Sequence, residues 1–167
     1  MSDDRTIQRD RMRFTRNTLS ANLVLLAILF DVFYFINIYK SDINHDVGNF
    51  YYQFRIGASI ILNLVFMLAA FLSSEGIKNY KVQYAYLLIG LGALQIARIF
   101  ILPLQALRTE VTIAGNTGTV MEMAQFVRVT IYLIISSICC FASAVIGIKR
   151  SRELNEHLAS LGLTANA

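Results

Sequence analysis

Two oppositely charged residues are unusual in this sequence because each lies within a long apolar stretch. Asp31 occurs in LVLLAILFDVFYF, and Arg98 occurs in LGALQIARIFILPL. A charge removed from water is costly unless an opposite charge or hydrogen bonds compensate it. The chemistry that these residues suggest is therefore a buried ion pair, or a site where a carboxylate binds an ion or a small ligand.

Four uncharged polar residues lie in similar apolar surroundings and could complete such a site. Gln95 is one helical turn before Arg98, where it could brace the guanidinium, and Tyr34 is one turn after Asp31. Asn63 and Ser136 occur in two further apolar stretches. The candidate polar layer thus consists of Asp31, Tyr34, Asn63, Gln95, Arg98 and Ser136.

The elements that must position these residues are four apolar segments, each about as long as a bilayer crossing, which takes roughly 20 residues as a helix. They cover residues 19–39, 52–73, 84–104 and 126–148. Since they are too long for barrel strands and do not alternate with period two, we expect helices. We predict an all-α integral membrane protein, an antiparallel four-helix bundle formed by one domain of residues 19–148.

The composition supports this class of protein. Of 167 residues, 56% are hydrophobic and only 16% are charged, whereas soluble domains carry about 25% charged residues. The charges are concentrated in the connectors and in the two ends, a tail of residues 1–18 and a tail of residues 149–167. The second tail has leucines at helical spacing among charged residues, which predicts a short amphipathic helix.

The polar residues of the four segments lie at similar depths. With a rise of about 1.5 Å per residue, all except Tyr34 fall about 9–15 Å below the outer surface of the hydrocarbon. The first and third segments run in the same direction, so Asp31 and Arg98 could pair directly. Two alternatives remain open: Arg98 could extend to the outer surface, and Asp31 could be protonated and neutral.

Lys and Arg residues near the segment ends predict the orientation, because cytoplasmic loops carry an excess of them. They gather in both tails and in the connector after the second segment, so we expect both termini on the cytoplasmic side of a cell membrane. The expected cytoplasmic anchors are Arg9, Arg11, Arg13, Arg16, Lys78, Lys81, Lys149 and Arg150. Acidic residues dilute the basic N-terminal tail, which favours headgroup contact over nucleic-acid binding.

Small residues recur at helical spacing in the third and fourth segments, a pattern that lets helix backbones approach closely. The small-residue faces of these two segments could pack within the bundle or against a partner. It comprises Gly90, Ala93, Ala97, Ser136, Cys140, Ser143 and Gly147. The adjacent Cys139 and Cys140 are expected to be packing residues, because neighbouring helix positions point in different directions and a disulfide between them would be strained.

The two connectors on the outer side suggest different structures. Asp42, His45 and Asp46 could bind a divalent cation, although a solvated turn is the favoured interpretation, and we expect no metal site. The sequence EVTIAGNTGTVME has two β-prone runs around a turn-rich AGNTG, which predicts a small hairpin.

The chain lacks the motifs of a cofactor-dependent or hydrolytic enzyme. It has no C-x-x-C, G-x-S-x-G, H-E-x-x-H or nucleotide-binding loop, and its two histidines, His45 and His157, lie outside the apolar segments. We therefore expect no catalytic residues and no cofactor.

Two resemblances bear on function. The stretches RMRFTRNTLSANLVLLAILF, FMLAAFLSSEGIKNY and QIARIFILPL are similar to an uncharacterised family of small four-span bacterial membrane proteins, which implies a bacterial cell membrane and supplies no activity. The layout also resembles small multidrug-resistance transporters, in which Asp31 would correspond to the essential acidic residue of the first helix. This chain departs from that family in its long charged tails and in Arg98.

These observations favour a non-catalytic accessory or assembly subunit of a larger membrane complex. Its partners would be the lipid bilayer and either another membrane protein or further copies of this chain. The alternative is an oligomeric transporter or channel for ions or small molecules that uses Asp31.

Overall fold

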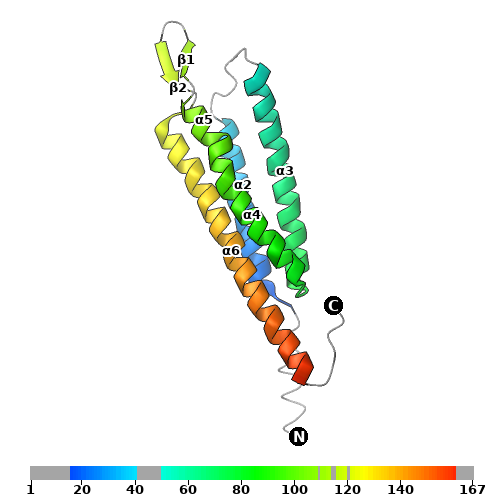
Figure 1. Cartoon of the computed structure of the whole chain (residues 1–167). Helices are drawn as coiled ribbons and strands as arrows, with labels where there is room; N and C mark the ends of the chain where they lie inside the picture. The colour runs from blue at the N-terminus through cyan, green and yellow to red at the C-terminus, as the bar shows by residue number, and fades with distance from the viewer. Residues whose placement is uncertain (1–15, 41–49, 109, 114–115, 120, 161–167) are drawn as a thin grey trace.

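The computed structural model describes residues 16–40, 50–108, 110–113, 116–119 and 121–160. Four long helices run alongside one another, and a short helix and a β-hairpin lie at one end (Figure 1). The elements are α2 (Thr18–Lys40), α3 (Phe50–Lys78), α4 (Val82–Ile101), α5 (Pro103–Arg108), β1 (Glu110–Ile113), β2 (Asn116–Thr119) and α6 (Met123–Ser160).

The four long helices correspond to the four predicted segments, and each is long and apolar enough to cross a membrane. The prediction of a helical bundle with four candidate spans is therefore confirmed, although the boundaries differ. The third segment was expected to continue to residue 104, but α4 ends at Ile101. Leu102 separates α4 from α5, which begins at Pro103; proline has no N–H to donate to the preceding turn, so it is tolerated best in the first turn of a helix.

The segment after residue 148 is helical as predicted, but it continues the fourth helix instead of starting a new one. The fourth apolar segment and the charged segment that follows form one helix, α6, which is 38 residues long. No proline or glycine lies between Ile148 and Ser160 to interrupt it. The amphipathic segment is consequently a rigid extension of the bundle rather than an independent element.

The predicted hairpin between α5 and α6 is confirmed. Strands β1 and β2 pair antiparallel, with Glu110 opposite Thr119 and Ile113 opposite Asn116. We call the end of the bundle that carries α5 and the hairpin the hairpin end. The opposite end, where the turn of residues 79–81 joins α3 to α4 and where α6 projects, is the tail end (Figure 1).

Helix α6 lies at the centre of the packing, since it contacts both α2 and α4 extensively. Helix α3 packs mainly against α2 and less against α4, and it is the most exposed of the four. Only 28% of the most apolar 18-residue stretch of α3 is buried, compared with 44% of the corresponding stretch of α6. The two helices that carry Asp31 and Arg98, α2 and α4, both pack on α6.

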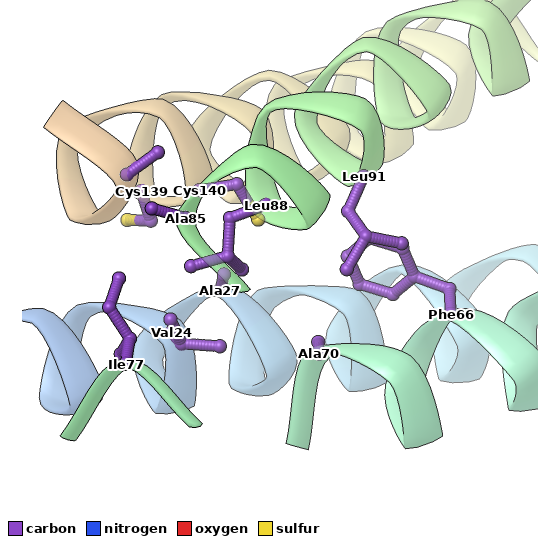
Figure 2. Close-up of a cluster of buried hydrophobic side chains, with 11 residues drawn as sticks. Val24, Ala27, Phe66, Ala70, Ile77, Ala85, Leu88, Leu91, Cys139 and Cys140 are labelled. Atoms are coloured by element: carbon purple, nitrogen blue, oxygen red, sulfur yellow. The ribbon is translucent and has the colours of Figure 1, made fainter. Parts of the chain in front are cut away.

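The interior contains two apolar clusters. The larger one fills the tail half with side chains from all four long helices; Figure 2 shows Val24 and Ala27 facing Leu88, with Phe66 beside Leu91. The smaller one lies at the hairpin end, around Tyr34, and includes Leu102, Met121 and Leu133. On α2 and α6, Asp31 and Ser136 fall in sequence between the buried members of the two clusters.

Candidate functional site: a buried polar network

Asp31 and Arg98 form a direct ion pair in the bundle interior. Nη1 of Arg98 on α4 donates a hydrogen bond to Oδ1 of Asp31 on α2 over 2.7 Å. The side chains are 2% and 0% exposed. Arg98 is thus turned into the bundle, and the alternative in which it extends to the outer surface is wrong.

Gln95 connects this ion pair to α6. Its Nε2 donates to Oδ1 of Asp31 over 2.9 Å and to Oγ of Ser136 over 3.0 Å, and its Oε1 accepts a hydrogen bond from Nη1 of Arg98 over 2.7 Å. Ser136 in turn donates to the backbone carbonyl of Ala27 on α2 over 3.0 Å. One amide side chain therefore ties three helices together.

Asn63 brings the fourth helix, α3, into the same cluster. Its Oδ1 accepts a hydrogen bond from Nη2 of Arg98, and its side chain is fully buried. We refer to the five connected residues as the polar network; they are Asp31, Asn63, Gln95, Arg98 and Ser136. Every long helix contributes at least one of them.

Two aromatic rings complete the surroundings of the guanidinium. Cζ of Arg98 lies 4.7 Å from the ring centroid of Tyr34 and 5.8 Å from that of Phe66, distances at which the negative face of a ring attracts a cation. Tyr34 was predicted to belong to the polar layer. Phe66 was missed, although it lies three residues after Asn63, one turn along the same face of α3.

Some hydrogen-bonding atoms of the polar network have no partner within the network. Oδ2 of Asp31, Nε of Arg98 and Nδ2 of Asn63 are buried, and none has a hydrogen-bond partner among the described residues. One acceptor and two donors therefore remain available at this depth. Buried polar groups are normally paired, so such atoms are characteristic of a site that holds something or of a strained one.

The small residues predicted on α6 face the interior. Ser136, Cys140, Ser143 and Gly147 are all buried, and Oγ of Ser143 donates to the backbone carbonyl of Ser20 on α2 over 2.8 Å. A Cβ added at Gly147 would lie 2.3 Å from Cδ1 of Ile77, a side chain of α3. At this face α6 therefore lies close to both α2 and α3.

The small residues predicted on α4 do not pack within the bundle. Gly90, Ala93 and Ala97 are exposed, and a Cβ added at Gly90 would meet no atom within 4 Å. The inward face of α4 instead carries Arg98, Gln95 and the buried Gly92. A Cβ added at Gly92 would lie 3.1 Å from the ring of Phe141. The within-bundle interpretation of this face is therefore wrong, while contact with a partner stays a prediction.

The expected basic anchors that the structure describes lie at the tail end. Arg16, Lys81 and Lys149 are exposed. Lys78 forms an ion pair of 3.1 Å with Glu75, and Nη1 of Arg150 lies 3.4 Å from Oδ1 of Asn17, to which it donates. Three further predicted anchors, Arg9, Arg11 and Arg13, lie outside the described residues.

Other candidates from the sequence contribute little to a site. The acidic residues and histidine of the first outer connector, Asp42, His45 and Asp46, lie outside the described residues. In the described part of the chain, no group of three potential metal ligands comes together. Cys139 and Cys140 are both buried and free.

Several polar residues that hold the helices together were not predicted. Asn17 precedes α2, and its Oδ1 accepts a hydrogen bond from the backbone N–H of Ser20, as expected for an N-cap. Ser74, Ser137 and Ser151 donate to backbone carbonyls of Ala21, Gly92 and Tyr80, respectively. The N-cap could have been found from the NTLS sequence, whereas the serine contacts depend on which side of each helix faces inward.

A comparison with known proteins finds no matching protein-family model, no similar curated protein and no similar solved structure. The resemblances to four-span bacterial proteins therefore gain no support from relatives. What the structure supports is the coarser class, a multi-pass helical protein of the kind found in membranes.

Proposed function

We propose that this chain is an integral membrane protein with both termini on the cytoplasmic side, and that it serves as a non-catalytic accessory or assembly subunit of a larger membrane complex. The distribution of basic residues supports the orientation, because those at the tail end lie beside both described chain termini. The bilayer would enclose the four long helices.

The observation that carries the proposal is how the intramembrane charges are used. Asp31 and Arg98 bind each other, and Gln95 and Asn63 bind them from two sides. The hydrogen bonds run between helices and the groups are buried, so the network acts as an internal fastening of the bundle. A charge pair that is engaged in this way is poorly placed to meet a substrate.

The face through which a partner would bind is the exposed strip formed by Gly90, Ala93 and Ala97 on α4. Small residues at this spacing let a second helix approach a backbone closely. The bundle fills the space at Gly76, Gly92 and Gly147 with its own side chains, whereas the space at Gly57 on α3 and at Gly90 on α4 is open. The strip thus offers a helix-sized contact that the chain itself does not use.

The test is purification of the tagged full chain from its native membranes in mild detergent, followed by mass spectrometry of the co-purifying proteins. The wild type should retain a defined partner, and Gly90→Leu should lose it while the variant still elutes as a folded species. Ala58→Leu is the matched control, since Ala58 is also exposed but lies on α3. Equal retention by both variants would contradict the proposed contact.

A second candidate function, transport of an ion or small molecule, is favoured by one observation. Oδ2 of Asp31 and Nε of Arg98 are buried without a hydrogen-bond partner among the described residues, and a carboxylate with a free oxygen can bind a proton or a cation. Flux through proteoliposomes that contain the purified chain tests it. A transporter would lose flux in Asp31→Asn, whereas an accessory subunit would show no flux with either sequence.

A further inference from the structure

A groove of about 440 Å³ lies along α6 at the tail end, from the level at which Gly147 faces Ile77 to the charged part of the helix beyond it. The residues that line it recur every three or four positions, so they share one face of the helix. We call it the α6 groove; its lining consists of Val145, Ile148, Lys149, Arg152, Glu153 and Glu156.

The chemistry of the α6 groove changes in a fixed order along the helix axis. Val145 and Ile148 are apolar and come first, Lys149 and Arg152 are cationic and follow, and the two glutamates come last. With a rise of about 1.5 Å per residue, each change of chemistry takes place over a few ångströms. The groove therefore presents an apolar, a positive and a negative zone in succession.

The proposed membrane insertion places these zones at the edge of the hydrocarbon. Residues 129–148 of α6 carry no charged side chain, and this length of helix spans about 30 Å, the thickness of the hydrocarbon core. Lys149 is thus the first charge beyond it, at the level of lipid phosphates. The apolar zone lies at the level of the acyl chains, and the glutamates lie further into the headgroup region.

The charged groups of the groove are not engaged elsewhere. Within the part of the chain that the structure describes, Lys149, Arg152, Glu153 and Glu156 form no ion pair or hydrogen bond through their side chains. Lys78 at the same end is different, because its Nζ is occupied by Glu75. The two cations and the two carboxylates of the groove are therefore available to a ligand.

We propose that the α6 groove binds a zwitterionic glycerophospholipid with a primary ammonium group, that is, a lipid of the phosphatidylethanolamine class. Lys149 and Arg152 bind the phosphate, Glu153 and Glu156 accept hydrogen bonds from the ammonium, and the acyl chain lies along Val145 and Ile148. The order of charges in such a lipid, phosphate nearer the acyl chains and ammonium further out, matches the order along α6. The proposal rests on the proposed membrane insertion and is independent of any protein partner.

Two related lipid classes fit less well. A choline headgroup carries its positive charge without N–H donors, so it lacks the charge-assisted hydrogen bonds that a carboxylate makes with a primary ammonium. A glycerol headgroup has no positive charge, and its phosphate would approach the lysine and arginine while leaving both glutamates without a counter-charge. The glutamates should therefore decide which lipid is preferred.

The test is native mass spectrometry of the full chain, extracted from membranes and supplied with equal amounts of ethanolamine, choline and glycerol phospholipids that share the same acyl chains. The ethanolamine lipid should be retained about fivefold more than either of the others, as expected from two solvent-accessible ion pairs. The variant Glu153→Gln/Glu156→Gln should remove this preference. The variant Lys149→Gln/Arg152→Gln should lower the retention of all three lipids by about fivefold or more.

The matched control is Glu75→Gln/Lys78→Gln, which removes one acidic and one basic residue at the same end and should leave retention unchanged. Equal retention of the three lipids by the wild type would overturn the inference. So would a lipid-free dimer in which two copies of this chain associate through the α6 groove. A membrane-extracted chain without the preference would leave the proposed function standing. A chain that does not fractionate with membranes at all would overturn both.

Discussion

Around Asp31 and Arg98 the helices are joined by side-chain hydrogen bonds, whereas around Gly147, nearer the tail end, they are joined by close approach. In the polar network each contact involves at least one long polar side chain. Near Gly147, Ser143 on α6 donates to the backbone carbonyl of Ser20 on α2. Gly147 itself has no side chain, which leaves room for Ile77 of α3. Because the two regions belong to the same four helices, comparing them shows how much each kind of contact contributes to the stability of the bundle.

In the proposed membrane setting the difference is informative, because apolar side chains gain little by leaving lipid for one another. In a bilayer, packing of small residues and hydrogen bonds between helices replace the hydrophobic effect as the force that associates helices. The polar network contributes strong directional contacts with a large penalty when one member is lost. The tail half contributes many weak contacts that depend on shape.

Arg98→Leu should have the largest effect on stability. The substitution leaves the carboxylate of Asp31 buried with Gln95 as its remaining hydrogen-bond partner among the described residues, and loss of one member of a buried pair costs about 3–5 kcal/mol. We expect a failure to accumulate or a large drop in the thermal unfolding midpoint in detergent. Arg128→Leu is the control, because Arg128 is exposed on α6; similar losses in both variants would argue that Arg98 is an ordinary boundary charge.

Gly147→Ala should have an intermediate effect and sharpen the contrast. The added Cβ would clash with Cδ1 and Cγ1 of Ile77, so either that side chain must leave its present position or the two helices must shift, at a cost of about 1–3 kcal/mol. Gly90→Ala is matched in chemistry and should be neutral or stabilise the fold by up to about 1 kcal/mol, because alanine is the better helix former and the space is open. Chemical denaturation in detergent measures the free energy of unfolding of both variants. If Gly90→Ala lowered it as much as Gly147→Ala, close packing at Gly147 would not explain the effect.

Ser143→Ala should have the smallest effect. It removes the hydrogen bond to the carbonyl of Ser20, and such contacts between membrane helices contribute about 0.6 kcal/mol on average. Ser160→Ala, which removes a contact within the exposed end of α6, should change nothing measurable. If Ser143→Ala destabilised the protein as much as Arg98→Leu, the distinction between the two regions would be lost.

The sequence was sufficient to predict the four helices and the hairpin, because a long apolar run and a turn flanked by β-prone residues are strong local signals. It was insufficient for the ends of α4 and α6. A charged segment without proline or glycine can either continue a helix or begin a new one, and only the packing of the preceding turns decides. At the other boundary, hydropathy does not reveal the break at Leu102 between α4 and α5, because the apolar run continues through it.

The polar network could be anticipated because few polar residues occur in the apolar segments and their depths coincide. The orientation of the small-residue faces could not. Helix α4 is apolar on all sides, so the pattern Gly90, Ala93 and Ala97 does not reveal which side faces inward. The position of Arg98 and Gln95 settles it, since burying both turns the small residues outward. The role of Phe66 likewise depends on the neighbouring helix.

A charge-reversal exchange measures the pairing of Asp31 and Arg98 most directly. Asp31→Arg and Arg98→Asp should each bring two like charges together in the bundle interior, and each should abolish the folded peak in size-exclusion chromatography of detergent extracts. The double variant Asp31→Arg/Arg98→Asp restores opposite charges at the same two positions, and we expect it to recover much of that peak and of the unfolding midpoint. A double variant that folds no better than the worse single variant would contradict the account.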